Sequence, residues 1–463
     1  MKKSILVIMI LGLAAGLFPA LKPSHAQDNI ELTFLHIFPD ERDIRRTTVQ
    51  AIADAYMEEH PNVTVTIELS TDQYADVFDG ALRAAGQGNP PDIVMVEDSF
   101  SQLAIDSQLF VKISDYATEE HMASISDILP AVQNYYGLSD GEIWGMPWNA
   151  SNPIMFYNAE MFTAAGLDPN DPPQTFDEIM AACEAIMSAE IENLQGCINW
   201  PVTSWLPEQW LSMQNVLFTD NENGHTGRVT STNINSEPML RIFQWWKELA
   251  DKGYFTYSGK PNDYTNEGLM FITKRTAIHF NSSAALSNIV GIDYPDDRED
   301  KAGFAETLGK FTPMAAPLPK PDESATNGIS VGGAAVWVMA GNSEEETRAA
   351  VDFIFYLINT ENQAQWHTAS GYFPIRQSSI DLLESEGWFE SNPYFHVPLD
   401  QILTVEPNPA NAGAVMGAYI QVRSAVADAI ISMIGGESPE AVLEAAQARA
   451  DQAIAEYNAV IGG

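Results

Sequence analysis

The chain has 463 residues, 45% of them hydrophobic, with ten tryptophans and a formal net charge of −40 at pH 7. This length exceeds what one ordinary hydrophobic core supports, so two or more domains are expected, and the composition excludes a disordered chain. The negative charge opposes binding to nucleic acid and to anionic lipid. Any site for an anionic ligand must therefore be built locally.

Residues 1–26 have the three parts of a secretory signal peptide. Lys2 and Lys3 form the basic start, residues 5–18 form an apolar run, and residues 24–26 form a small-x-small cleavage site. The apolar run is short for a membrane span, no later stretch is long enough for one, and no cysteine directly follows it to carry a lipid. We therefore expect a periplasmic protein that is secreted through a cleaved signal peptide and is not lipid-anchored.

Strands and helices alternate through the first part of the mature chain. The expected elements are a strand at 31–36, a helix that Pro61 closes, a strand at 63–67, a helix at 74–85 and a strand at 93–96. This β-α-β-α-β order predicts a mainly parallel sheet with right-handed connections.

The chain then changes character around two prolines. Pro147 and Pro153 interrupt an extended run, which predicts a crossover between two units rather than a regular central strand. Beyond it, Thr175 and Glu178 form a capping box at the start of a helix, and Ser343 with Glu346 predicts a second box further along. The proline- and glycine-rich stretch 313–333 is interpreted as the chain recrossing.

Two residue types leave alternatives open. Cys183 and Cys197 are the only cysteines, and in an exported protein they form either a disulfide or two buried thiols. Zinc is not expected, because no histidine lies at ligand spacing from either of them. Trp200, Trp205 and Trp210 are either core residues or a stacking surface for sugar or polyol faces.

One motif is typical of an enzyme. Residues 328–332 read GISVG and fit the G-x-S-x-G nucleophile elbow of α/β-hydrolases. That elbow needs a buried strand before the serine and a helix after it, whereas a polar stretch precedes this serine and an apolar run follows it. We therefore expect no enzyme, with a secreted hydrolase as the remote alternative.

Several spaced motifs together resemble one family. They are PWNASNP at 147–153, FYN at 156–158, AAGL at 164–167 and PPQTFDEI at 172–179. They are similar to the extracellular solute-binding proteins of ABC importers (family 1). From about Gln73 onward the chain most resembles the branch that binds sn-glycerol-3-phosphate.

The resemblance implies an α/β protein with the two-lobed periplasmic-binding-protein fold (type II), with a mainly parallel sheet in each lobe and a ligand cleft between the lobes. The expected boundaries are signal peptide 1–26, lobe 1 at 27–148, lobe 2 at 149–310, a return to lobe 1 with hinge crossings at 311–337, and lobe 2 with C-terminal helices at 338–463.

The resemblance also implies a set of ligand-binding residues. They are Tyr74, an acid at Glu97 or Asp98, Ser151, Trp205, Ser282 or Ser283, Gly332 or Gly333, Tyr372 and Arg423. A phosphate group suits a guanidinium, hydroxyl donors and glycine N–H groups, and a glycerol end suits a carboxylate acceptor and an aromatic face.

The function that the resemblance implies is capture of sn-glycerol-3-phosphate or a glycerophosphodiester by lobe closure, followed by delivery to a membrane permease. The alternative is the same fold binding a neutral mono- or oligosaccharide. A monomer without a cofactor or a metal is expected.

Overall fold

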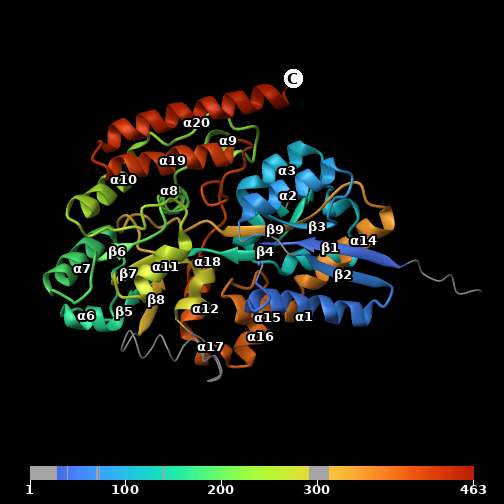
Figure 1. Ribbon diagram of the computed structural model, residues 1–463, viewed down its shortest axis with the longest axis horizontal. Helices are drawn as coiled ribbons and strands as arrows, with labels where there is room; N and C mark the ends of the chain where they lie inside the picture. The colour runs from blue at the N-terminus through green and yellow to red at the C-terminus, as the bar shows by residue number, and fades with distance from the viewer. Residues whose placement is uncertain are drawn as a thin grey trace, which may run out of the picture.

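The computed structural model describes residues 29–38, 40–68, 71, 73–138, 141–290 and 312–462, and the predicted signal peptide lies outside these ranges. The described residues form two α/β lobes, each built around one sheet (Figure 1). In this part of the chain, no helix combines the length and the apolar character that crossing a membrane requires.

The first sheet has the strand order β2-β1-β3-β9-β4. Its strands are β1 (Ile30–Leu35), β2 (Val63–Glu68), β3 (Ile93–Glu97), β4 (Gly145–Ser151) and β9 (Gly332–Val338). β1 runs parallel to β2 and β3, whereas β9 runs antiparallel to β3 and β4. Side chains along β2 alternate between buried and exposed, while the first four residues of β3 are all buried.

The second sheet has the strand order β6-β7-β5-β8. Its strands are β5 (Pro153–Asn158), β6 (Ile198–Asn199), β7 (Ile278–Ser282) and β8 (Pro313–Pro317). β5 is antiparallel to β7 and β8, and β6 is parallel to β7. One strand in each described sheet therefore runs against the others, which confirms the prediction of two mainly parallel sheets.

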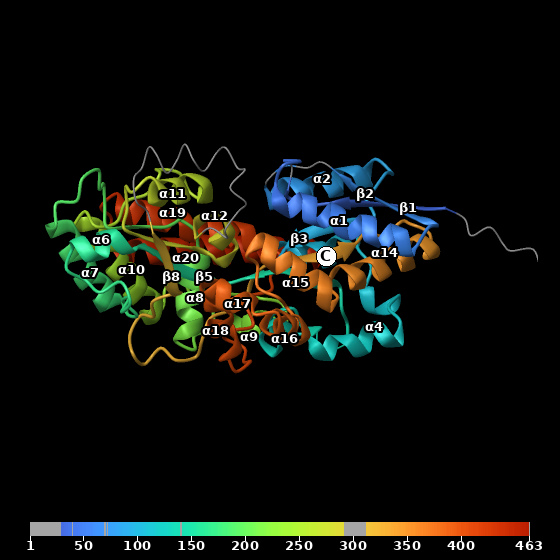
Figure 2. The ribbon, with the colours of Figure 1, turned by 90° about the horizontal axis from the view of Figure 1, so that it is seen from below.

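Helices cover both sheets. The helices beside the first sheet are α1 (Ile44–Glu59), α2 (Tyr74–Gly86), α3 (Ser101–Ser107), α4 (Glu119–Ser124), α5 (Pro130–Tyr135), α14 (Glu344–Leu357), α15 (Thr360–Ser370) and α16 (Gln377–Ser385). Those of the second lobe are α6 (Ala159–Ala164), α7 (Phe176–Ser188), α8 (Trp205–Met213), α9 (Asp220–Asn223), α10 (Glu237–Asp251), α11 (Tyr264–Ile272), α12 (Leu286–Ile289), α17 (Trp388–Ser391), α18 (Val397–Leu403), α19 (Tyr419–Ile434) and α20 (Pro439–Ile461). Figure 2 shows α1, α2 and α14 on one side of the molecule and α6, α7 and α11 on the other.

Local sequence signals set the helix starts. The side chain of Thr175 accepts a hydrogen bond from the Glu178 N–H, and the Glu178 side chain accepts one from the Thr175 N–H. Ser343 and Glu346 form the same reciprocal pair at the start of α14. Each box satisfies two N–H groups that the helix itself leaves free, so both predictions are confirmed.

The first crossing between the lobes is a single residue. Asn152 alone separates β4, at the edge of the first sheet, from β5, in the interior of the second. Pro153 occupies the first position of β5, and the register shifts between Pro147 and Asn149. Proline lacks an N–H, and these are the positions that a sheet tolerates for it. The expectation of an irregular crossover is therefore corrected, because two strands continue almost to the crossing point.

The later crossings differ from the expected boundaries. β8 belongs to the second sheet, whereas the sequence predicts that residues 311–337 return to lobe 1. α14 packs on β1 and α1, and α15 packs on α1, so these helices lie with the first sheet rather than with the second lobe. The amphipathic pattern of a helix shows that it has a buried face but not which sheet it covers.

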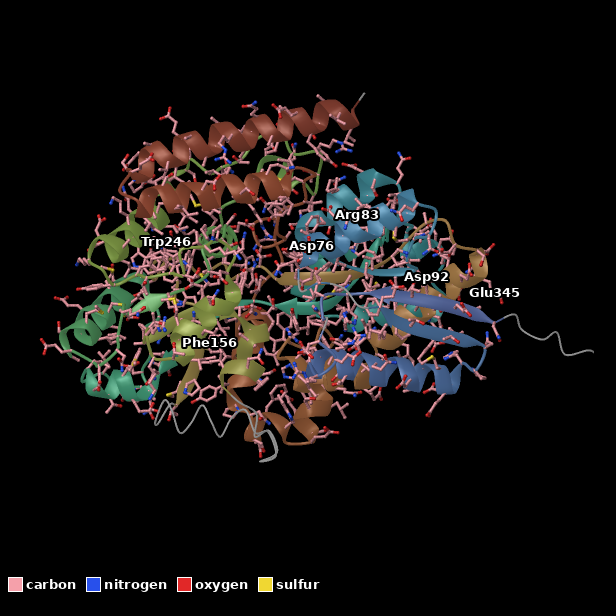
Figure 3. The ribbon with its side chains drawn as sticks, viewed as in Figure 1. Asp76, Arg83, Asp92, Phe156, Trp246 and Glu345 are labelled. Carbon is pink, nitrogen blue, oxygen red and sulfur yellow. A yellow bond between two sulfur atoms is a disulfide. The ribbon has the colours of Figure 1, made fainter. Side chains whose placement is uncertain are left out.

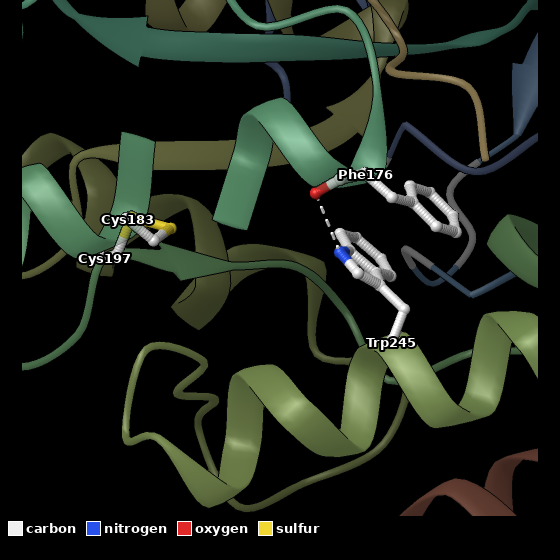
Figure 4. Close-up of a disulfide and its surroundings, with 4 residues drawn as sticks. All are labelled: Phe176, Cys183, Cys197 and Trp245. Carbon is white, nitrogen blue, oxygen red and sulfur yellow. Dashed lines mark hydrogen bonds between the residues drawn. A yellow bond between two sulfur atoms is a disulfide. The ribbon is translucent and has the colours of Figure 1, made fainter. Parts of the chain in front are cut away.

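The second lobe has a dense aromatic core. Trp246 on α10 and Phe156 on β5 are fully buried within it (Figure 3). The Trp245 indole stacks on the Phe176 ring at 3.7 Å and donates a hydrogen bond of 3.2 Å to the Phe176 carbonyl (Figure 4). Nearby, a disulfide between Cys183 and Cys197 joins α7 to the start of β6.

Candidate functional site

Arg423 on α19 is the centre of a network that joins the two lobes. Its Nε and Nη2 donate to Glu208 of α8, at 3.2 and 3.0 Å. Its Nη1 donates to Glu97 Oε1 at 2.9 Å, and Glu97 is the last residue of β3 in the first sheet. The Arg423 side chain is 16% exposed and that of Glu208 is 10% exposed. We call Arg423, Glu97 and Glu208 the central network.

Neighbouring groups hold the central network in place. The Tyr419 hydroxyl donates to Glu208 Oε2 at 2.9 Å, and its ring lies 4.4 Å from the guanidinium of Arg423. The Ser204 hydroxyl donates to the other oxygen of Glu208. Burial alone would lower the pKa of Arg423, but Glu208, Tyr419 and Glu97 raise it well above its ordinary value. Two carboxylates therefore face one permanently charged guanidinium.

A buried acid lies beside this network. Asp98, directly after β3, is 9% exposed. Burial, and then the charge of Glu97, raise the pKa of Asp98 to about 7. The hydroxyl of Tyr136 is also buried. The two groups interact with each other, because the Tyr136 hydroxyl acts on the Asp98 carboxyl as a hydrogen-bond partner and Asp98 in turn raises the pKa of Tyr136.

Trp205 lies against the glycines of β9. A Cβ added to Gly332 would lie 2.8 Å from the Trp205 Nε1, so only glycine allows this approach. The Ser151 hydroxyl donates to the Gly332 carbonyl at 3.4 Å. Gly333 has a φ of +131°, and a Cβ there would collide with the Asn149 carbonyl. Both glycines are therefore required by packing, in addition to any role in ligand binding.

Two tyrosines lie on the first-lobe side of the network. The hydroxyls of Tyr74 and Tyr372 are 3.5 Å apart. Burial, and then Tyr372, raise the pKa of Tyr74 well above its ordinary value, and the charge of Glu97 acts in the same direction. Arg45 forms an ion pair with Asp43 at 2.5 Å and interacts electrostatically with both tyrosine hydroxyls. A second cation therefore lies near these hydroxyls. The structure thus brings Tyr74 and Tyr372 together near Glu97.

Ser282 and Ser283 have different partners. Ser282 accepts a hydrogen bond from the Ala284 N–H and caps a short helix. Ser283 is fully buried, and its hydroxyl accepts from the Asn152 N–H at 3.4 Å. Its own N–H donates to the Asn152 carbonyl at 2.9 Å. These hydrogen bonds hold the crossover between the lobes rather than the central network.

A small hollow lies beside the central network. Trp205, Glu208 and Tyr419 line it from the second lobe, and Tyr135 lines it from the first. The hollow therefore lies at the boundary between the lobes, and its wall holds the Glu208 carboxylate and four aromatic rings, the fourth being that of Phe218.

Sequence reasoning missed four residues around this site: Glu208, Tyr419, Arg45 and Tyr264. Glu208 lies one helical turn after Trp205, and Tyr419 lies one turn before Arg423, so helical spacing could have indicated both. Tyr264, at the start of α11, interacts electrostatically with Arg423 and Glu97. Neither Arg45 nor Tyr264 has a comparable signal, because each approaches from a distant part of the chain.

A two-lobed molecule with a polar and aromatic network between its lobes is typical of proteins that bind small solutes. The model of the bacterial extracellular solute-binding protein family matches residues 51–396. The chain belongs to this family. It is thus the solute-binding component of an ABC importer, with an extracellular or periplasmic location.

Individual relatives agree with this assignment. The chain is 28% identical over 386 residues to the sn-glycerol-3-phosphate-binding periplasmic protein UgpB of Rhizobium meliloti (strain 1021), covering 82% of this chain and 85% of that protein. It is 26% identical over 434 residues to UgpB of Pectobacterium atrosepticum, covering 93% and 92%.

Two solved structures share the fold. UgpB from Mycobacterium tuberculosis, in complex with glycerophosphocholine, has a TM-score of 0.72 at 17% identity, covering 92% of this chain and 98% of that one. The cyclic alpha-maltosyl-1,6-maltose binding protein from Arthrobacter globiformis has a TM-score of 0.70 at 20% identity, covering 92% and 99%. At these identities the likeness establishes the fold alone.

Membership of this family makes the protein non-catalytic, and the structure explains the misleading serine motif. Ser330 precedes β9 instead of following a strand, and its N–H donates to the side chain of Gln209 at 2.9 Å. A nucleophile elbow needs a strand before the serine and a helix after it. The hydrolase alternative is therefore wrong.

Proposed function

We propose that this solute-binding protein captures a glycerol phosphate compound, either sn-glycerol-3-phosphate or a glycerophosphodiester, and delivers it to its permease. The observation that carries the proposal is Arg423, a guanidinium with 16% of its side chain exposed at the boundary between the lobes. The relatives named UgpB, which align over most of the chain, support the same ligand class.

The surrounding groups fit the two ends of such a ligand. A guanidinium donates two parallel hydrogen bonds to a phosphate, which strengthens and orients the contact. The Glu97 carboxylate, whose side chain is 24% exposed, can accept from a glycerol hydroxyl, and the partly buried Trp205 ring can cover a carbon face. Closure follows when a ligand binds both lobes and so favours the closed arrangement over the open one.

A neutral saccharide is the second candidate. It is favoured by the pairing of Arg423 with two carboxylates, which already neutralises the cation. A sugar would stack on Trp205 and use the carboxylates as hydroxyl acceptors. The Arthrobacter relative in fold binds such a ligand, as its name states.

Calorimetry on the mature protein separates these candidates. Arg423→Ala should weaken binding of sn-glycerol-3-phosphate or glycerophosphocholine about 10- to 150-fold, because one hydrogen bond to a charged group contributes roughly 1.5–3 kcal/mol. Arg423→Lys should fall between wild type and alanine, since it keeps the charge but loses the planar donor pair. Binding of a disaccharide should change much less.

Arg449→Ala is the matched control, because Arg449 pairs with Asp428 within the second lobe, between α20 and α19, outside the central network and away from the lobe boundary. This variant should leave the affinity for both phosphate compounds unchanged. Wild-type affinity for them in Arg423→Ala would contradict the phosphate proposal. Tight binding of the disaccharide with no binding of either phosphate compound would establish the second candidate.

Lobe closure gives an independent measurement. Saturating ligand should change the intrinsic fluorescence, because Trp205 lines the hollow between the lobes, and should reduce the radius of gyration in solution scattering. If neither signal changes at millimolar ligand, the proposed ligand class is wrong.

A further inference from the structure

Glu208 holds the position that an anionic ligand would be expected to take. Its two oxygens accept from Arg423 Nε and Nη2, which is the two-pronged geometry that a guanidinium also offers to phosphate. Tyr419 and Ser204 each donate to one of these oxygens, so the carboxylate is fixed by four hydrogen bonds. The Glu208 carboxylate is therefore an anion that belongs to the protein itself and is bound to Arg423. We call it the internal anion.

This internal anion changes what Arg423 can attract. Glu97 and Glu208 together outnumber the guanidinium by one negative charge, in a chain whose net charge is already −40. A ligand anion must share Arg423 with Glu208 or displace it, and either event brings like charges close together. The repulsion grows with the charge of the ligand and is strong where water is partly excluded.

We propose that Glu208 determines ligand charge and makes the site prefer a singly charged phosphodiester to a doubly charged phosphomonoester. The inference rests on the proposed function and names the substrate class within it. A monoester carries close to two negative charges above pH 7, because its second pKa is about 6, whereas a diester carries one.

The test compares two ligands that share the glycerol end, sn-glycerol-3-phosphate and its methyl ester, by calorimetry at pH 7.5. The wild-type protein should bind the methyl ester more tightly than the monoester. Glu208→Gln removes the charge but keeps an oxygen that can accept from Arg423. This variant should shift the preference toward the monoester by roughly tenfold, the size expected for one partly screened charge about 6 Å away.

Two further variants keep the inference falsifiable. Tyr419→Phe removes a hydrogen bond to Glu208 without altering its charge, so the preference should remain that of wild type. If Glu208→Gln does not fold, Glu97→Gln removes the other carboxylate from Arg423, and the preference should shift in the same direction by a smaller factor.

The outcomes are distinct. A preference unchanged in Glu208→Gln, with both esters bound, would overturn the role of Glu208 and leave the proposed function intact. An equal loss of affinity for both esters would mean that Glu208 only positions Arg423, and would also overturn it. If the wild-type protein binds neither ester, the proposed function itself is wrong.

Discussion

The two lobes meet at two ionic junctions of opposite character. The first is the central network around Arg423. The second, which we call the outer junction, is made by Arg228, Asp106, Tyr457 and Gln102. Both Nη atoms of Arg228 donate to Asp106 of α3, at 3.0 and 2.7 Å. Tyr457 of α20 and Gln102 add donors at 2.9 and 3.0 Å.

The two junctions differ in how their positive and negative charges are balanced. At the outer junction one carboxylate meets one guanidinium and two neutral donors, and the Arg228 side chain is 45% exposed. At the central network two carboxylates share one guanidinium, and burial together with Glu97 raises the pKa of the neighbouring Asp98 to about 7. The outer junction has its full set of partners without a ligand. An unbalanced, buried one gains partners only when a ligand arrives.

The sharpest test of this contrast is the loss of each arginine in the absence of ligand. Arg423→Ala leaves Glu97 and Glu208 facing each other without a cation, and breaking a buried pair in this way costs about 3–5 kcal/mol. We expect the free energy of unfolding, measured by urea denaturation, to fall by about 3 kcal/mol. A loss below about 1 kcal/mol would show that the network is solvated like a surface pair.

Asp98 provides a test through pH. Its pKa is raised to about 7, so the folded state binds its proton more tightly than the unfolded chain, whose aspartates titrate near 4. The contribution of the protonated Asp98 side chain to the free energy of unfolding is therefore fully present below pH 4. It is lost as the pH rises to about 7.

Asp98→Asn removes this titration. Relative to wild type, we expect no gain near pH 4 and a gain in unfolding free energy of roughly 1–3 kcal/mol at pH 8. Thermal or urea denaturation at several pH values, without ligand, measures the difference. A gain that is independent of pH would mean that Asp98 is not the group that titrates.

The smallest effect is expected at the outer junction. Arg228→Ala should lower the free energy of unfolding by less than about 1 kcal/mol, because the Arg228 side chain is 45% exposed and the buried Asp106 keeps its donors Tyr457 and Gln102. The difference from wild type should shrink further at high salt. A loss as large as that in Arg423→Ala would remove the distinction between the two junctions.

Local features were predicted well from the sequence. The capping boxes at Thr175 and Ser343 depend on residues three positions apart, and both are present. Pro153 indicated the point where the chain changes lobe, because proline restricts which strand positions are possible. The overall fold followed from the order of the elements and from the family resemblance.

Long-range pairings were not predictable. Arg423 was expected at the site, but its partner Glu208 lies 215 positions away and nothing local connects the two. The tryptophans show the same limit: Trp200 and Trp210 are fully buried in the second lobe, while Trp205 lies at the boundary between the lobes. Regular spacing could not separate these roles, because each depends on which distant segment packs against the ring.

The disulfide between α7 and β6 makes the second lobe sensitive to the compartment in which it folds. It closes a loop across 14 positions, and cross-linking a loop of this size stabilises the folded state by about 3 kcal/mol, mainly by restricting the unfolded chain. In a reducing cytosol the second lobe lacks this contribution and unfolds more readily. Easier unfolding helps export, because a chain must be unfolded to be threaded through a membrane. Oxidation after export then makes the second lobe harder to unfold, and proteases outside the cell meet a more resistant protein than those inside.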